Sequence, residues 1–170
     1  MTAIDTYLHA IVVRAVREAR EDASATVEAQ HLLLGIADEP EATVREVLTS
    51  AGLDHRALRE ALGREFEHSL QTVGVSAAAH RLPRPSPACE QPKLGASAKL
   101  AMERGFASVS RKRDLRPAHL LLGVLQAQLG TVPRALALAG VDQAALLAQL
   151  RQELETTRDG GVARARGAAG

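Results

Sequence analysis

The side chains best able to carry chemistry in this 170-residue chain are six histidines and one cysteine. A metal ion needs several His, Cys, Asp or Glu ligands at a spacing that brings them together, and the histidines do not show that spacing within any one predicted helix. Cys89 lies in a proline-rich stretch with no histidine close by in the sequence, so we interpret it as incidental rather than as a nucleophile. A single cysteine also excludes an internal disulfide.

The sequence motifs of common enzyme classes are absent. The chain contains no Gly-Lys pair and therefore lacks the G-x-x-x-x-G-K-[ST] loop that holds the phosphates of ATP. G-x-S-x-G, H-E-x-x-H and C-x-x-C are missing as well. We interpret five glutamates as solvent-exposed side chains with Lys or Arg neighbours, not as general acids or bases: Glu39, Glu41, Glu60, Glu65 and Glu67. The sequence thus predicts a protein without enzymatic activity, metal or cofactor.

Two of the histidines occupy equivalent positions. His31 and His119 each stand at the start of a predicted helix, and each is followed by Leu-Leu-Leu-Gly. They could form a paired ligand site. We favour a structural role, in which a partly buried imidazole bonds a nearby backbone group and orders the turn between helices. That role explains why both copies carry the residue.

The composition favours a helical protein with an aliphatic core. Hydrophobic residues make up 46% of the chain but aromatic residues only 2%, and a chain rich in Ala and Leu prefers helix over strand. The net charge of +1 gives no general attraction to nucleic acid or membranes. Neither a membrane-spanning stretch nor an uninterrupted apolar signal segment is present, so we expect a soluble, cytoplasmic protein.

An internal repeat positions the two histidines. The string His-Leu-Leu-Leu-Gly at residues 31–35 recurs 88 residues later at 119–123. Compared without gaps, residues 31–62 and 119–150 are identical at 14 of 32 positions. The matches include turn residues as well as leucines, and chance in a Leu-rich chain would not readily place Gly and Asp in register. The two stretches are therefore predicted to fold alike.

The first copy predicts four helices, three of them over about residues 4–22, 27–38 and 41–51. Thr26 is the predicted N-cap of the second helix, and Asp54 is that of the fourth. Gly52 is predicted to end the third helix in a left-handed conformation. Three residues of the fourth helix are predicted to face the core: Leu58, Leu62 and Phe66.

The second copy begins with a predicted helix over about residues 95–109, with Leu100 in the core. Pro117 suits the first turn of the next helix, where its missing N–H costs nothing. Thr131 is the predicted N-cap of the third helix, Gly140 its end and Asp142 the N-cap of the last. Four residues of the last helix are predicted to face inward: Leu146, Leu147, Leu150 and Leu154.

These positions resemble the Clp N-terminal repeat over about residues 4–155. The resemblance is carried by 15–19, Val27, 30–35, Val44, Leu48 and 51–54 in the first copy, and by 118–123, Val132, Leu136 and 140–142 in the second. It implies an all-α fold of two tandem, pseudo-symmetric four-helix repeats that form one eight-helix bundle. We place the repeats at residues 1–67 and 94–156, with a Pro-rich linker at 68–93 and a disordered tail at 157–170.

The resemblance also implies a binding function. In Clp unfoldases this domain docks adaptors and substrates ahead of the ATPase ring, and in some members it binds phosphorylated arginine through the Glu before the His. Gln30 and Ala118 replace that Glu in the two copies here. No carboxylate is left at either position to pair with a guanidinium, so the phosphoarginine mode is not expected. Arg84 of the linker also replaces an expected apolar aromatic residue near the inter-repeat surface.

We therefore predict a stand-alone accessory or decoy of the Clp protease system. Its partner would be a protein or peptide (a Clp unfoldase, adaptor or substrate) or a small amphipathic ligand. The candidate binding residues are His9, Ile11, Gln30, Lys99 and Ala118. The alternative is a small helical regulatory protein that binds nucleic acid through its basic tail and through residues 111–113. No group of residues supports a hydrolase or a transferase.

Overall fold

The computed structural model describes residues 3–38, 40–74 and 92–167, with side chains up to residue 157. Within these residues the protein has eight α-helices and only two strands of two residues each. The predicted all-α class is therefore confirmed. Cys89, His80 and Arg84 lie outside the described residues.

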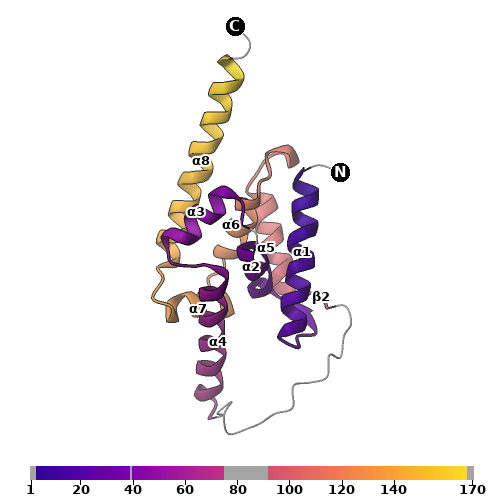
Figure 1. Cartoon of the computed structure of the whole chain (residues 1–170), viewed down its shortest axis with the longest axis vertical. Coiled ribbons are helices and arrows are strands. Elements are labelled where there is room, and N and C mark those ends of the chain that lie inside the picture. Colours follow the sequence, from indigo (N-terminus) through magenta and orange to yellow (C-terminus); the bar gives the residue numbers. More distant parts are fainter. Residues whose placement is uncertain (1–2, 39, 75–91, 168–170) are drawn as a thin grey trace.

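The first repeat contains α1 (Ala3–Glu21), α2 (Ala29–Asp38), α3 (Ala42–Ser50) and α4 (His55–Thr72). The second contains α5 (Ala96–Ala107), α6 (Pro117–Leu125), α7 (Thr131–Leu138) and α8 (Gln143–Gly167). A 3-10 turn, η1 (Lys112–Asp114), precedes α6. Figure 1 shows α2 and α6 at the centre, with α1 and α5 on one side and the other four helices on the opposite side.

The two Leu-rich helices are buried on nearly every side. In α2 all residues from His31 to Ala37 are buried, and in α6 all residues from Ala118 to Leu125 are buried. A helix that is apolar all round is stable only when other elements surround it. The leucine triplets are therefore core residues, as the sequence predicted, and the outer helices pack around them.

A glycine in each central helix lets its partner approach closely. A Cβ at Gly35 of α2 would lie 3.0 Å from the carbonyl oxygen of Ile11 on α1. A Cβ at Gly123 of α6 would overlap the carbonyl oxygen of Ala101 and lie 2.7 Å from the nitrogen of Gly105, both on α5. The glycine that follows each leucine triplet is thus required by a helix crossing.

Short parallel strands join the two repeats. Strand β1 (Thr26–Val27) pairs with β2 (Lys93–Leu94), with Thr26 opposite Lys93 and Val27 opposite Leu94. The N–H of Gly95 extends the contact by donating to the carbonyl of Val27 at 2.9 Å. Lys93, the last residue of the predicted linker, therefore belongs to the folded body. Helix α4 likewise reaches Thr72, inside the predicted linker.

Some helix caps differ from those predicted. Asp54 and Asp142 do cap α4 and α8, because their side chains accept bonds from Ala57 N and from Ala144 N and Ala145 N. Thr26 is in β1 instead, and α2 begins after Glu28. Thr131 is already inside α7, whose N-cap is Gly130 at φ 116°. Threonine is a common cap, but Thr26 is used in the pairing of β1 with β2. At α7 the cap position has a backbone conformation that only glycine adopts readily, so Gly130 precedes Thr131 there.

Two residues predicted to lie in the core, Phe66 and Leu100, are exposed, because a different face of each helix is buried. In α4 the buried residues are Leu58, Ala61 and Glu65, whereas Phe66 is 61% exposed. In α5 the buried residues are Ala98, Ala101 and Gly105, whereas Leu100 is 44% exposed. The close crossing with α6 requires small residues, so the larger Leu100 turns outward. In α8, Leu146 and Leu150 are buried and Leu147 and Leu154 partly buried, as predicted.

Helix α8 continues to Gly167, past residue 157, where its composition predicted a disordered tail. Residues 158–167 contain two Ala and three Arg, which favour helix, beside three Gly, which do not. A helix that is already formed is extended at low cost. None of the described helices combines the length and the apolar content needed to cross a lipid bilayer.

Candidate functional site

Both equivalent histidines hold the start of a central helix. The backbone N–H of Glu28 donates to Nδ1 of His31 at 2.9 Å, and the N–H of Arg116 donates to Nδ1 of His119 at 3.0 Å. These bonds satisfy a backbone donor at the N-cap, as a side chain at the third helical position does in a capping box. The structural role predicted for both histidines is confirmed.

The surroundings of the two rings differ. Because Nδ1 accepts a bond, the ring proton belongs on Nε2. In His31 that nitrogen lies 3.3 Å from Oδ2 of Asp22. Burial would raise the pKa of Asp22, but the hydrogen bond to His31 and the charge of Arg59 outweigh it and lower that pKa. Burial lowers the pKa of His119.

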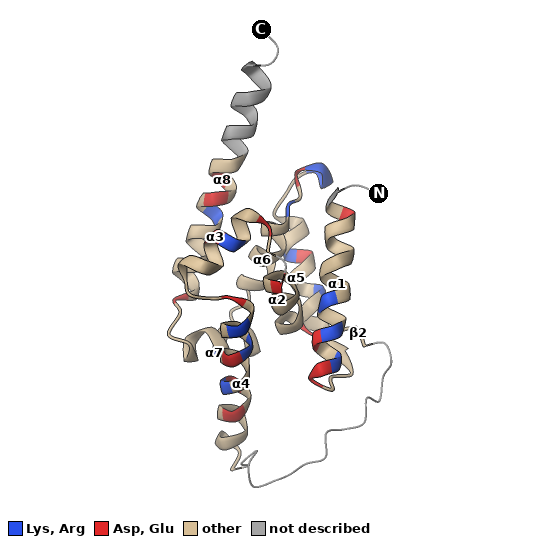
Figure 2. Cartoon of the chain, in the orientation of Figure 1, with Lys and Arg blue, Asp and Glu red and all other residues tan. Residues whose placement is uncertain are grey.

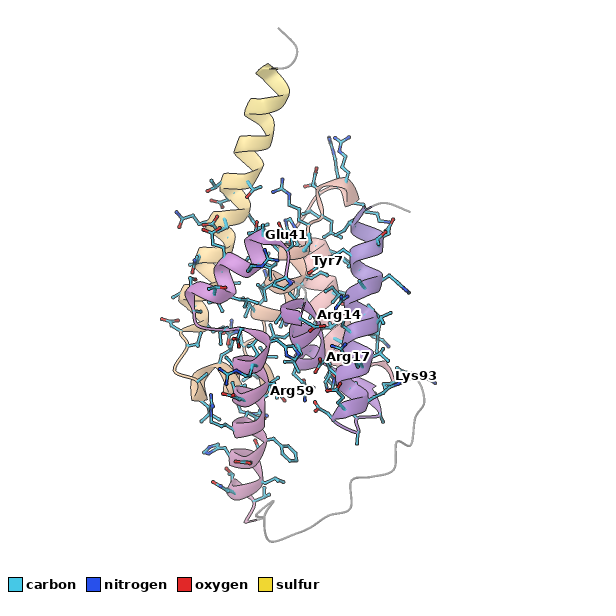
Figure 3. All side chains as sticks on the ribbon, in the orientation of Figure 1. Tyr7, Arg14, Arg17, Glu41, Arg59 and Lys93 are labelled. Carbon is cyan, nitrogen blue, oxygen red and sulfur yellow. The ribbon has the colours of Figure 1, made fainter. Side chains whose placement is uncertain are left out.

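A network of charges joins α1 to α4. The carboxylate of Glu18 is only 1% exposed and contacts Nη2 of Arg59 and, at 3.1 Å, Nε2 of His55. Arg59 also pairs with Glu21 at 2.9 Å and with Asp22 at 3.1 Å. Figure 3 shows Arg59 on α4 and Arg17 on α1 flanking this region. The charges in the network are paired, so it holds the helices together and offers no free acid or base.

A first pocket, here called the α4 pocket, adjoins this network. It has a volume of 440 Å³ and lies between the end of α1, α2 and α4, with one residue from α7. Its polar lining includes Asp22, Arg59 and Glu65, while Leu62 and Phe66 supply apolar surface. Glu65 is 4% exposed, and its Oε1 accepts bonds from Ser69 Oγ and Arg134 Nε, both at 2.7 Å.

A second pocket, here called the α5 pocket, has a volume of 310 Å³. Its lining comes from the start of α2, from α5 and from the loop that leads into α7. Leu100 and Leu129 give it an apolar wall, and Leu129 is 89% exposed. Gln30 and Thr131 line both pockets. The two pockets therefore adjoin each other where the repeats meet.

The structure does not bring the five predicted site residues together. Gln30 is half-buried and lines both pockets. Ile11 and Ala118 are each 1% exposed and belong to the core. Ile11 lines an apolar void of about 10 Å³, too small for a ligand. His9 on α1 and Lys99 on α5 are exposed but line neither pocket.

Most residues that line the two pockets were not among the predicted site residues. Leu129 and Thr131 lie in or beside a loop, where helical periodicity gives no information about direction. Arg104 could have been found, because it follows Leu100 by four residues and Ser97 by seven and so shares their helix face. Finding it required knowing that this face of α5 lies toward the loop before α7.

The basic stretch at residues 111–113 is exposed on the turn before α6. Lys112 pairs with Asp5 of α1 at 2.8 Å, and Arg113 lies 4.0 Å from Asp114. Positive and negative residues are interspersed over the described helices in Figure 2. Among the described residues, no group of three or more His, Cys, Asp or Glu is arranged to hold a metal ion.

Comparison with known proteins agrees with this architecture. The family model of the Clp repeat (R) N-terminal domain matches residues 4–109. The chain belongs to the Clp N-terminal repeat family. Proteins of this family carry the repeat as a protein-interaction module without catalytic activity of its own. No curated protein sequence matches the chain.

Solved structures show the same fold at low sequence identity. The N-terminal domain of the caseinolytic protease associated chaperone ClpD from Arabidopsis thaliana is similar with a TM-score of 0.60 and 21% identity, covering 88% of this chain and 92% of that one. The Hsp104 N-terminal domain from Candida albicans is similar with a TM-score of 0.57 and 15% identity, covering 84% and 85%. The helical Clp N-domain architecture therefore extends over both repeats.

Proposed function

We propose that this protein binds a segment of a partner protein in the groove formed by the α4 pocket and the α5 pocket, as an accessory or decoy of a Clp protease system. The observation that carries the proposal is that two half-apolar pockets meet at Gln30 and Thr131, between the repeats. Polypeptide segments suit open grooves that offer apolar side-chain sites and some polar groups.

The exposed apolar residues support this location. Among the large apolar side chains that are exposed in the described residues, Phe66 lines the α4 pocket and Leu100 and Leu129 line the α5 pocket. Exposed apolar side chains that gather around a cavity mark interaction sites more often than scattered ones do. A partner segment would cover them and displace water from the groove.

Affinity capture with matched variants tests the proposal. The wild-type protein should retain Clp unfoldase, adaptor or substrate proteins above about 0.15 M salt, where exposed charge contacts are screened. Leu129→Asp should lose most of this binding. Leu138→Asp, at an exposed leucine outside both pockets, is the control and should retain it. Equal capture by both variants, or no Clp component with the wild type, would refute the proposal.

A further inference from the structure

Arg104 lines the α5 pocket and has no partner among the residues that the structure describes. It lies half-buried on α5 and lines the pocket, yet within the described residues it forms no hydrogen bond or ion pair. Arg59, the other described arginine that lines one of these pockets, differs in this respect because it contacts three carboxylates. A guanidinium offers five donors in a fixed plane, and a carboxylate matches them best.

The acid in the same pocket does not supply that partner. Glu28 accepts bonds from Thr26 Oγ1 at 2.8 Å and from both the N–H and the hydroxyl of Ser97. Burial would raise the pKa of Glu28, but the hydrogen bonds from Ser97 and Thr26 outweigh it and lower that pKa. Glu28 is therefore ionised at neutral pH, and its carboxylate oxygens already accept hydrogen bonds from these neighbours. Ser97 and Arg104 are seven residues apart on α5, which is roughly 10 Å along a helix.

The pocket is therefore polarised along its length. Glu28 and its donors occupy the end near Ser97, Arg104 occupies the other, and the apolar side chains of Leu100 and Leu129 lie in the wall. The start of α7 at Gly130 and Thr131 also lines the pocket and has no side-chain cap, which further favours negative charge in the pocket. The pocket also adjoins the α4 pocket, so a chain can continue from one into the other.

We propose that the α5 pocket binds an internal acidic residue of a partner segment, an Asp or Glu with apolar neighbours, and that Arg104 pairs with its carboxylate. This inference rests on the proposed function and adds the chemistry of the bound segment. An internal residue is favoured over a chain terminus because the groove continues beyond the pocket. Apolar neighbours of the acid contact Leu100 and Leu129.

Short fluorescent peptides with blocked ends test this chemistry on the full chain. One peptide places Glu between two Leu residues, and matched peptides replace the Glu with Gln or Lys, or both Leu with Ser. A further peptide ends in a free carboxylate after Leu. The wild type should bind the Glu peptide about tenfold more tightly than the Gln peptide, as expected for one partly exposed charged hydrogen-bond pair. The Ser peptide and the Lys peptide should bind most weakly.

Variants of α5 identify the residue responsible. Arg104→Gln should remove the tenfold preference for Glu over Gln, and Arg104→Glu should reverse it in favour of the Lys peptide. Lys99→Gln removes the same charge from the same helix outside the pocket and should leave the preference unchanged. Thermal unfolding by circular dichroism checks that all variants are folded. Because Arg104 is not a core residue, we expect their melting temperatures to match the wild type.

Three outcomes overturn the inference. Equal affinity for Glu and Gln peptides, with both sensitive to Leu129→Asp, would retain the groove of the proposed function but remove the role of Arg104. Tighter binding of the free-carboxylate peptide than of the Glu peptide would assign Arg104 to chain termini instead. Absence of binding by every peptide would remove both this inference and the peptide-binding groove.

Discussion

Gly123 has no room for a methyl group, because its Cβ position overlaps the backbone of Ala101 on α5. Gly35, its equivalent in the first repeat, is tight but less so, with the closest backbone atom 3.0 Å away. At both sites the neighbour is main chain, which cannot rotate aside as a side chain can. The same glycine in the two repeats is therefore under unequal steric constraint.

We expect Gly123→Ala to lower the free energy of unfolding by about 3 kcal/mol or more, and Gly35→Ala by about 1–2 kcal/mol, because overpacking forces the backbone to shift. Gly63 of α4 is the matched control, since a Cβ there meets nothing within 4 Å. Gly63→Ala should instead stabilise the protein by about 0.5–1 kcal/mol through better helix propensity. Urea denaturation measures all three, and equal losses at the three sites would contradict the steric argument.

His119 should make stability depend on pH. Burial lowers its pKa in the folded protein, so the neutral ring is favoured there. As pH falls below the unfolded value of about 6.5, the unfolded chain takes up a proton that the folded protein does not yet bind. Stability is thus fully present above that pH and declines as pH falls toward and through the lower folded pKa.

The variant His119→Asn tests this dependence, because it keeps an acceptor near the Arg116 N–H but cannot titrate. Its free energy of unfolding, measured by urea denaturation between pH 8 and pH 5 (about one unit or more on each side of an ordinary histidine pKa), should decline less steeply than that of the wild type. The remaining histidines contribute alike to both proteins. Parallel curves for the two would show that the His119 ring does not cause the loss.

At the scale of helices, Arg59 holds α4 against α1 through three carboxylates. The buried one, Glu18, matters most, since a buried charge without its partner is costly. We expect Arg59→Met to lower the free energy of unfolding by about 2–4 kcal/mol, somewhat less than for a fully buried pair because the arginine side chain is 35% exposed. His55 remains near Glu18 and limits the loss.

Arg56→Met provides the control for this measurement. Arg56 lies on the same helix and pairs with Glu60 at 3.2 Å, but both side chains are mostly exposed. An exposed pair of this kind contributes about 0.3–0.5 kcal/mol. A similar small loss for Arg59→Met, measured by the same denaturation, would mean that the α1–α4 network does not depend on the arginine.

The sequence predicted where helices and turns lie better than it predicted which face of each helix is buried. Gly52 and Gly140 have positive φ and Asp54 and Asp142 cap helices, because local chemistry alone determines these features. The outward turn of Leu100 depends on how closely α5 crosses α6, and the position of Thr26 depends on a strand far along the chain. The pocket residues Arg104 and Leu129 depend on how the repeats meet, so the repeat pattern alone could not identify them.

At the scale of the whole molecule, neither repeat has a complete core. Helix α2 contacts α5 and α6, α4 contacts α7, and α3 contacts α8. Leu33 and Leu121, each at most 1% exposed, lie in one shared cluster. Arg134 of α7 reaches the buried Glu65 of α4 across the same boundary. Each repeat alone would expose apolar surface that the other covers.

We therefore expect residues 1–74 alone to lack a cooperative fold. Their circular dichroism melting curve should be gradual, and their amide NMR signals should be poorly dispersed. Addition of residues 92–170 should restore helical signal and a sharp transition, because association covers the shared core. A sharp transition for residues 1–74 alone would show instead that the first repeat is an independent domain.

Gln30 and Thr131 line both the α4 pocket and the α5 pocket. A rotation of either side chain that enlarges one cavity removes space or polar groups from the other. Occupancies of neighbouring sites that share a movable wall are thermodynamically linked, and the linkage is reciprocal. Two short peptides, one for each cavity, would therefore not bind with independent affinities. The affinity of a single longer peptide that occupies both cavities would depend on how these two side chains are arranged.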